Sequence, residues 1–430
     1  MITDRSIAPE IHPISGIRYP DVKSIQLTNK IPVHILTSGM QEVAKIELIF
    51  FAGRWQEHKR AVATCTASLF KEGTSKRSSL DIANLIDYYG ASIQVSSFID
   101  YSSLTLYCLN KHLEYLLPLM TELITEASFP ESELELYIRN NKQKIEVNEK
   151  KVEHLGQRLF TSVLFGKNHP IGYTTSKQDL EVLSRKDLLM FKQQHYHHEN
   201  AFIIASGKLT DSHIQLIDRH LGIPLNQPAD KKTSIVSLDA SPVDLYIDEK
   251  ADALQSAIRV GKRFINKLHP DYPLVKATNL VLGEYFGSRL MSNLREDKGF
   301  CYGIYSTIAS FVNEAYLCIA TEVGADVTES ALHEIENEIL RLQNDLIDVD
   351  ELQSAMNYRM GVFLGDLDGA FNQHDFLKGL LLFGADKEYM LHYVDRLRSA
   401  TPQAIRDIAQ RYYRSDTFYK VIAGKNINVS

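Results

Sequence analysis

The pattern of apolar and polar residues predicts a strand followed by two helices in the first quarter of the chain. Residues Ile46–Phe51 are nearly all apolar, as in a buried strand. Residues 61–74 (AVATCTASLFKEGT) carry apolar side chains at helical spacing, and Gly73 is a typical helix end. A polar turn and a second amphipathic helix follow, and Gly90 ends that helix. The first quarter of the chain therefore contains a strand–helix–helix unit.

The remainder of the first half alternates between strand and helix patterns. Period-two alternation predicts a hairpin, and wider apolar stripes predict helices. Pro130 suits the first turn of a long helix, and Ser184 suits an N-cap. The predicted elements are a strand at Val33–Leu36, a hairpin of Ser92–Ser97 with Ser102–Cys108, helices at Leu113–Ala127, Pro130 to about Phe165 and Ser184–His195, and a strand at Ala201–Ser206.

The second half of the chain repeats the first. The segment SRKDLLMFKQQHYHHENAFIIASGKL aligns without a gap on TPQAIRDIAQRYYRSDTFYKVIAGKN. Gly207 aligns with Gly424, an offset of 217 residues (424 minus 207), and Ser184 with Thr401 and Tyr196 with Tyr413 have the same offset. Such self-similarity predicts an internal duplication of a domain of roughly 200 residues.

The element order predicts an α+β fold of two homologous domains, each a largely antiparallel sheet with helices packed on it. We assign residues 1–221 to the N-terminal domain and residues 243–430 to the C-terminal domain. Residues 222–242 (GIPLNQPADKKTSIVSLDASP) have three prolines, paired lysines and small side chains, which predict a linker.

Composition and charge exclude several classes of protein. The net charge of −7 has no long run of one sign, which argues against binding to nucleic acid or to an anionic membrane. The first twenty residues lack the apolar core of a signal peptide. The four cysteines, Cys65, Cys108, Cys301 and Cys318, are widely spaced in apolar segments, so we expect buried free thiols and a cytoplasmic location.

The strand, helix, Gly-Thr, helix order resembles the pitrilysin/insulinase-like zinc metallopeptidases, which include the mitochondrial processing peptidase and its bacterial relatives. In catalytic members the first helix carries an inverted zinc motif, His-x-x-Glu-His, shortly before a Gly-Thr pair. Placing Gly73-Thr74 on that pair puts Thr64, Ala67 and Ser68 at the positions of the histidine, the glutamate and the second histidine.

None of these three residues suits a zinc site. Alanine has no donor atom, and neutral hydroxyls are poor zinc ligands beside imidazole or thiolate. The third ligand of the family is an acid on a later long helix, for which Glu146 is the nearest candidate. The resemblance therefore implies a member that keeps the scaffold, holds no metal itself, and relies on zinc in a homologous catalytic partner subunit.

The second half carries the other signature of the family, in the text GEYFGSRLMSNLREDKGFCYGIYS of residues 283–306. The resemblance assigns the family's Arg to Arg295 and its Tyr to Tyr302, with Gly299 in place between them. By resemblance, Arg295 holds a carbonyl or carboxylate of the substrate peptide and Tyr302 donates to the oxyanion. A guanidinium fork and a phenol hydroxyl suit these roles chemically. The same residue types in isolation are more often a solvated helix end and a packing residue.

A histidine cluster offers one further candidate metal site. His195, His197 and His198 crowd the end of a predicted helix. Exposed cationic side chains at the negative end of the helix dipole explain them more simply than a metal does.

Two functional hypotheses follow. The first is a non-catalytic subunit of a heterodimeric zinc metallopeptidase that forms half of a clamshell chamber and binds unfolded peptide. The second is a purely structural subunit that has lost peptidase function, as in the core subunits of membrane complexes that share this fold. Retention of Arg295 and Tyr302 favours the first hypothesis. An independent enzyme with another catalytic centre has no residues to support it.

Overall fold

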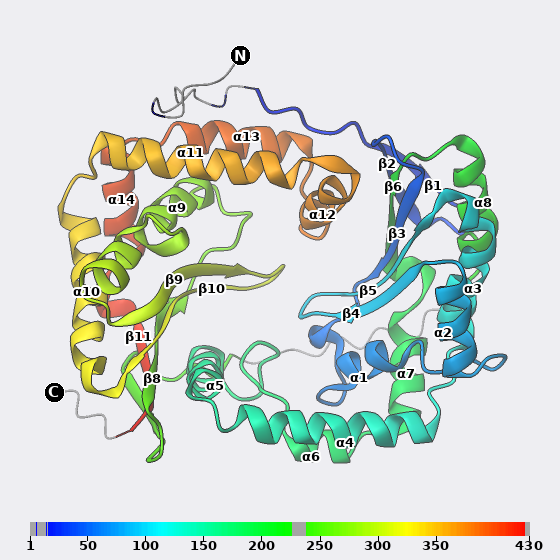
Figure 1. Ribbon diagram of the computed structural model, residues 1–430, viewed down its shortest axis with the longest axis horizontal. Coiled ribbons are helices and arrows are strands. Elements are labelled where there is room, and N and C mark those ends of the chain that lie inside the picture. Colours follow the sequence, from blue (N-terminus) through cyan, green and yellow to red (C-terminus); the bar gives the residue numbers. More distant parts are fainter. Residues whose placement is uncertain (1–5, 7–13, 15, 226–237, 426–430) are drawn as a thin grey trace.

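The structure is a computed structural model that describes residues 6, 14, 16–225 and 238–425. Two β-sheets stand at opposite sides of the molecule in Figure 1, and helices connect and cover them. The strands of sheet 1 are β1 (Lys23–Gln26), β2 (Pro32–Thr37), β3 (Val43–Phe50), β4 (Ser92–Ser97), β5 (Ser102–Leu109) and β6 (Ala201–Gly207). The strands of sheet 2 are β7 (Leu245–Glu249), β8 (Gln255–Arg263), β9 (Cys301–Ser310), β10 (Ala315–Gly324) and β11 (Tyr419–Gly424).

Helices fall in corresponding places in the two halves. The α-helices of the first half are α1 (Val62–Leu69), α2 (Ser79–Tyr88), α3 (Leu113–Glu126), α4 (Glu131–Asn148), α5 (Val152–Phe165), α6 (Lys177–Glu181), α7 (Arg185–His195) and α8 (Asp211–Leu221). Those of the second half are α9 (Tyr272–Asn279), α10 (Thr328–Asn344), α11 (Val349–Asp366), α12 (Gly369–Leu381), α13 (Lys387–Arg398) and α14 (Pro402–Tyr412). Two π-helical segments, Leu280–Glu284 and Met291–Asp297, follow α9.

The sheet topology confirms the duplication and the α+β class. Sheet 1 has the order β1-β2-β6-β3-β5-β4, and sheet 2 has the order β7-β11-β8-β10-β9. Apart from the additional strand β1, the two orders correspond strand for strand. Each sheet contains one parallel pair, β2 with β6 and β7 with β11, and is otherwise antiparallel. The domain limits at residues 221 and 243 stay a prediction, and residues 226–237 of the proposed linker lie outside the described residues.

Local patterns predicted most elements within a few residues, with one clear error. The helical stretch from Pro130 to Phe165 is two helices, because the chain turns at 149–151 and Lys151 is extended. The residues at this turn, Glu-Lys-Lys, are good helix formers, so tertiary packing overrides their propensity. No helix among the described residues is long and apolar enough to cross a membrane.

Because of the turn at 149–151, α5 packs on sheet 2, the sheet of the second half of the chain. Helix α4 runs along the lower edge of the molecule in Figure 1, from the side of sheet 1 to the side of sheet 2, where α5 packs on β8 and β11. The approach is close, because a Cβ at Gly156 would lie 3.2 Å from the Cβ of Ala257. Phe160 and Val163 share a buried cluster with Val421. A helix of the first half therefore covers sheet 2.

Helix α12 makes the reciprocal crossing. It follows α11, which runs along the upper edge of Figure 1, and it packs on β2 and β6 of sheet 1. Its buried Leu377 shares an apolar cluster with Leu36, Ile49, Phe202 and Ile204. Because α5 and α12 occupy equivalent places in the two halves, the halves exchange one helix each.

A buried polar network fixes α12 to sheet 1. The Ser206 hydroxyl lies 2.8 Å from Nδ1 of His374, and Nε2 of His374 lies 2.9 Å from Oε2 of Glu47. Lys378 also donates to Glu47, at 3.1 Å and 3.2 Å. Burial lowers the pKa of His374 to about 4, so the ring is neutral and donates through Nε2. Although burial opposes it, the bonds from His374 and Lys378 lower the pKa of Glu47 to about 2.

This exchange gives a testable expectation for limited proteolysis. We expect trypsin to cut first within residues 222–242, after Lys231 or Lys232, because the segment combines lysines with prolines and small residues. The two fragments should remain together on size-exclusion chromatography, because each retains a helix on the sheet of the other. Separation of the fragments under native conditions would contradict the packing described above.

The cysteines are free, as predicted, and three of the four are buried. Burial raises the pKa values of the Cys65, Cys108 and Cys318 thiols to about 12, so they are inert at neutral pH. The expectation of burial is wrong for Cys301, which is partly exposed at the start of the edge strand β9.

Candidate functional site

Helix α1 presents the first and last of the three degenerate positions to solvent. Thr64 and Ser68 are exposed and lie one helical turn apart, so they share a face. Ala67 is 3% exposed and faces the core. The backbone thus keeps the geometry in which two ligands at i and i+4 could face one metal, while the side chains there are hydroxyls.

The structure does not bring Glu146 to this pair. Ser68 interacts electrostatically with Tyr137 of α4, and burial raises the pKa of that tyrosine. Glu146 is nine residues further along the same helix, about 14 Å at 1.5 Å per residue. Its side chain is 57% exposed and pairs with Lys177 at 2.8 Å. One turn beyond Tyr137 stands Asn141, which is a neutral amide. The sequence offered no signal for the Ser68–Tyr137 contact.

The donor set at α1 therefore does not fit a zinc ion. Thr64, Ala67 and Ser68 supply no imidazole, thiolate or carboxylate, and the acid predicted to join them lies elsewhere. Across residues 16–225 and 238–425, no three His, Cys, Asp or Glu side chains gather as a metal site requires.

The histidine cluster also differs from expectation. His197 is buried rather than exposed, with 1% of its surface accessible. His195 packs on Phe191 at 4.7 Å between ring centroids, and His198 Nδ1 lies 3.2 Å from the carbonyl oxygen of Leu225. Among the described residues the three rings do not converge as a metal site requires.

The lack of suitable ligands predicts that the purified chain carries no stoichiometric zinc. We expect elemental analysis after dialysis against a weak chelator to find well under one zinc per chain, both for the wild type and for Glu146→Ala. The chain alone should then hydrolyse unfolded peptides only at background rate. One tightly bound zinc that Glu146→Ala removes would overturn this interpretation of α1.

A capped turn positions Arg295 relative to Tyr302. Arg295 lies in the π-helix Met291–Asp297, which ends where the Phe300 amide donates to the Leu294 carbonyl at 2.8 Å. Gly299 has a φ of +64°, the left-handed conformation that favours glycine at a helix end. The guanidinium of Arg295 stacks on the ring of Phe286 at 4.7 Å. Within the described residues it makes no hydrogen bond or ion pair, so its donors are available.

Tyr302 stands at an irregularity in the edge of sheet 2. In the ladder between β9 and β10, Ile304 pairs with Thr321 and Cys301 pairs with Val323, so Tyr302 and Gly303 lie opposite one residue. Such bulges redirect side chains. The Tyr302 side chain is 92% exposed, and its hydroxyl has no partner in the part of the chain that the structure describes. It is not a packing residue.

An edge strand lies beside α1 in the first half. Strand β4 forms one edge of sheet 1, and its other side pairs with β5. Helix α1 packs against β4. A chain that added to β4 as a further strand would therefore pass along the helix that carries Thr64 and Ser68.

Comparisons with known proteins define the class. Two sequence models of one family match the chain: "Insulinase (Peptidase family M16)" matches residues 34–176, and "Peptidase M16 inactive domain" matches residues 183–358. The chain belongs to peptidase family M16, the insulinase-like metallopeptidases, as its sequence motifs predicted.

Individual relatives are distant but match over most of the chain. "Uncharacterized zinc protease YmxG" of Bacillus subtilis is 23% identical over 89% of this chain and 94% of its own length. A crystal structure of a peptidase M16 inactive domain from Pseudomonas fluorescens has a TM-score of 0.87, at 20% identity over 95% of this chain and all of that chain. A chain of complex III from Candida albicans has a TM-score of 0.75, at 15% identity over 94% and 96% of the two chains. These two structural likenesses support the fold.

Proposed function

We propose that this chain is the non-catalytic subunit of a two-subunit metallopeptidase. It contributes one group that binds the substrate and one that donates a hydrogen bond to the oxyanion of the reaction. The observation that carries the proposal is the free donors of Arg295 and Tyr302. Arg295 lies in the last turn of a capped π-helix and Tyr302 lies near the start of β9, and neither side chain makes a hydrogen bond within the described residues. A side chain that is 92% exposed stabilises the fold little, so packing does not explain its presence.

The chemistry of the two groups suits amide hydrolysis. A guanidinium offers a planar pair of N–H donors to a carbonyl or carboxylate of the peptide. A phenol hydroxyl can donate to the oxygen on which negative charge develops as the amide carbon becomes tetrahedral. The stacking of Arg295 on Phe286 limits the rotamers of the guanidinium, which lowers the entropic cost of binding.

The hydrolytic centre would come from a homologous subunit with an intact His-x-x-Glu-His motif. This division is supported by the hydroxyl and methyl side chains at Thr64, Ala67 and Ser68, which cannot supply it. The peptide would be unfolded and would add to the free edge of β4, since main-chain hydrogen bonding to an edge strand accepts varied sequences.

A purely structural role is the second candidate, and the likeness to a chain of complex III favours it. Measuring the turnover of an unfolded peptide by this chain, by the homologous subunit, and by their mixture separates the two roles. Activity that requires both chains supports the proposed function. A mixture no more active than the homologous subunit alone would leave this chain a scaffold.

A further inference from the structure

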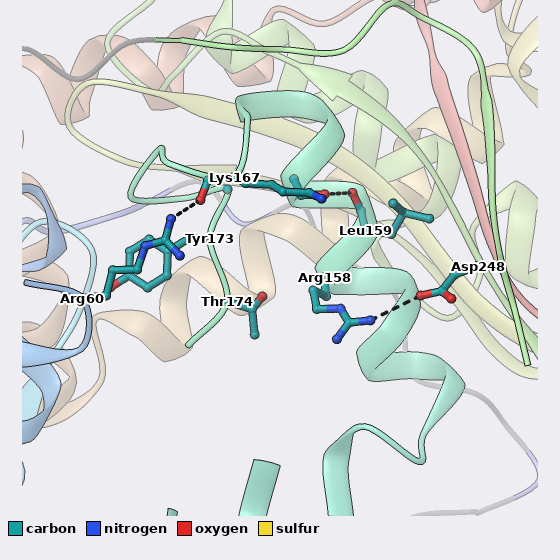
Figure 2. A pocket seen from close by; sticks show the side chains of 9 residues that line it. Arg60, Arg158, Leu159, Lys167, Tyr173, Thr174 and Asp248 are labelled. Carbon is teal, nitrogen blue, oxygen red and sulfur yellow. Dashed lines mark hydrogen bonds and ion pairs between the residues drawn. The ribbon is translucent and has the colours of Figure 1, made fainter. Parts of the chain in front are cut away.

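A basic hollow lies between the start of α1 and helix α5, apart from Arg295 and Tyr302. Its volume is about 380 Å³. Figure 2 shows Arg60 with Tyr173 on one wall and Arg158 of α5 on the other. Its charged and polar lining residues are Arg60, Arg158, Ser162, Lys167, Thr174 and Asp248, and Tyr173 adds an aromatic ring.

The charge of the hollow is opposite to that of the protein. Three cationic side chains line it and one carboxylate opposes them, whereas the whole chain has a net charge of −7. Asp179 lies 3.9 Å from the Arg60 guanidinium, at the limit of an ion pair, and neutralises it in part. A positive hollow on a negative protein favours an anionic ligand.

The wall of the hollow that Arg60 and Tyr173 form is held by several contacts. The guanidinium groups of Arg54 and Arg60 lie 4.6 Å and 5.1 Å from the centroid of the Tyr173 ring, and the Tyr173 hydroxyl donates to Glu57. Arg60 also donates to the Lys167 carbonyl at 2.7 Å and to the Asn168 side chain at 2.8 Å. The Arg60 guanidinium is thus held in place before a ligand binds, which reduces the conformational entropy lost on binding.

Several donors in the hollow remain unused. The Arg158 guanidinium has one partner in the described part of the chain, the Asp248 carboxylate at 3.4 Å, a long contact. The ammonium of Lys167 and the hydroxyl of Thr174 have none within the described residues. Figure 2 shows Thr174 between Arg60 and Arg158. Together these groups could donate several hydrogen bonds to one small anion.

One lining residue of the hollow, Arg60, lies close to the expected path of the peptide. Arg60 precedes Thr64 by four residues, which limits the distance between their Cα atoms to roughly 15 Å. We infer that this hollow binds a carboxylate of the substrate, the side chain of an acidic residue in the peptide held along β4. This inference rests on the proposed function and adds a preference for acidic peptides. An inorganic anion such as phosphate presents the same chemistry and is the alternative source.

Matched peptides and matched variants test this inference on the full-length chain. The probes are two fluorescent 16-residue peptides without folded structure, identical except for Asp or Asn at two central positions. We expect anisotropy titrations at low salt to give a Kd about tenfold lower for the Asp peptide. In the double variant Arg158→Gln/Lys167→Gln, the ratio of the Kd values of the Asn and Asp peptides should fall to about one. Lys111 is exposed elsewhere on the chain, so Lys111→Gln, which also removes a positive charge, should leave that ratio unchanged. Arg158→Lys should retain part of the preference.

Three outcomes would overturn the inference, and they leave different conclusions about the proposed function. Equal Kd values for both peptides in the wild-type chain would exclude a carboxylate site while leaving peptide binding intact. A preference that survives in the double variant would place the recognition elsewhere. Binding of inorganic phosphate, lost in the double variant, with no peptide binding at all, would assign the hollow to a free anion. Circular dichroism of each variant shows whether the fold is unchanged.

Discussion

Replacing Tyr302 with phenylalanine is expected to lower kcat of the reconstituted two-subunit peptidase by about 10²–10³-fold, the usual loss for one oxyanion donor. The change removes a single hydroxyl from a side chain that is 92% exposed, so folding and assembly should survive. The measurement is steady-state turnover of an unfolded peptide by this chain mixed with its catalytic partner. Tyr305→Phe is the matched control, because Tyr305 is half exposed on the same strand, and it should be nearly silent.

Arg295→Ala tests the second half of the pair. Since the guanidinium would hold the peptide before and during the reaction, its loss should raise KM as well as lower kcat. The zinc content of the complex should not change in either variant, because the proposed metal belongs to the partner. Wild-type turnover by the Tyr302→Phe complex would show that the tyrosine has no catalytic role and would move the structural-subunit hypothesis to first place.

The largest effect on stability is expected for Glu47→Gln, at about 3–5 kcal/mol of unfolding free energy, the usual loss when one partner of a buried ion pair is removed. Glu47 is 1% exposed and accepts hydrogen bonds from both His374 and Lys378. Glutamine has one acceptor oxygen, so its amide NH₂ group must face one of these donors. It also leaves Lys378 with less compensating charge. Urea unfolding followed by fluorescence measures the change.

Glu42→Gln is the control for that experiment. Glu42 pairs with Lys208 at 3.3 Å, and both side chains are more than half exposed. Surface pairs of this kind contribute little, so the free energy of unfolding should change by no more than about 0.5 kcal/mol. A similar small change for Glu47→Gln would show that the network does not hold α12 on sheet 1.

Much of the fold could be predicted because its signals are local or repeated. Period-two and helical patterns gave the hairpin β4–β5 and helices α3 and α7 within a few residues. The ungapped repeat that places Gly207 on Gly424 predicted the duplicated sheets, since each glycine ends an equivalent strand, β6 or β11.

Long-range packing left no comparable signal. The turn at 149–151 occurs in residues that favour helix, and only the position of sheet 2 explains it. The contact of Glu47 with His374 spans 327 positions of sequence, and nothing in either neighbourhood indicates the other. The exchange of α5 and α12 therefore could not be predicted from the pattern of residues along the chain.

For the candidate site too, the sequence indicated individual residues but not their contacts in space. Family motifs in the sequence selected Arg295, Gly299 and Tyr302 as candidates, and the structure places Arg295 in the last turn of a π-helix, Gly299 just after it and Tyr302 at the start of β9. The motifs did not give the stacking on Phe286 or the bulge that turns Tyr302 outward, because both depend on neighbours in space. Glu146 was selected by its place in the sequence, and the pitch of α4 carries it away from α1.

The helix exchange has a consequence for half-length chains. A fragment ending near residue 221 would carry α5 with no β8 or β11 to receive it, while the face of sheet 1 beneath α12 would be bare. In a second copy of the fragment, the bare face of sheet 1 could receive α5 of the first copy, and the reverse. Two such fragments can satisfy each other by domain swapping about a two-fold axis. We therefore expect such a half-length chain to be a homodimer in solution rather than a monomer.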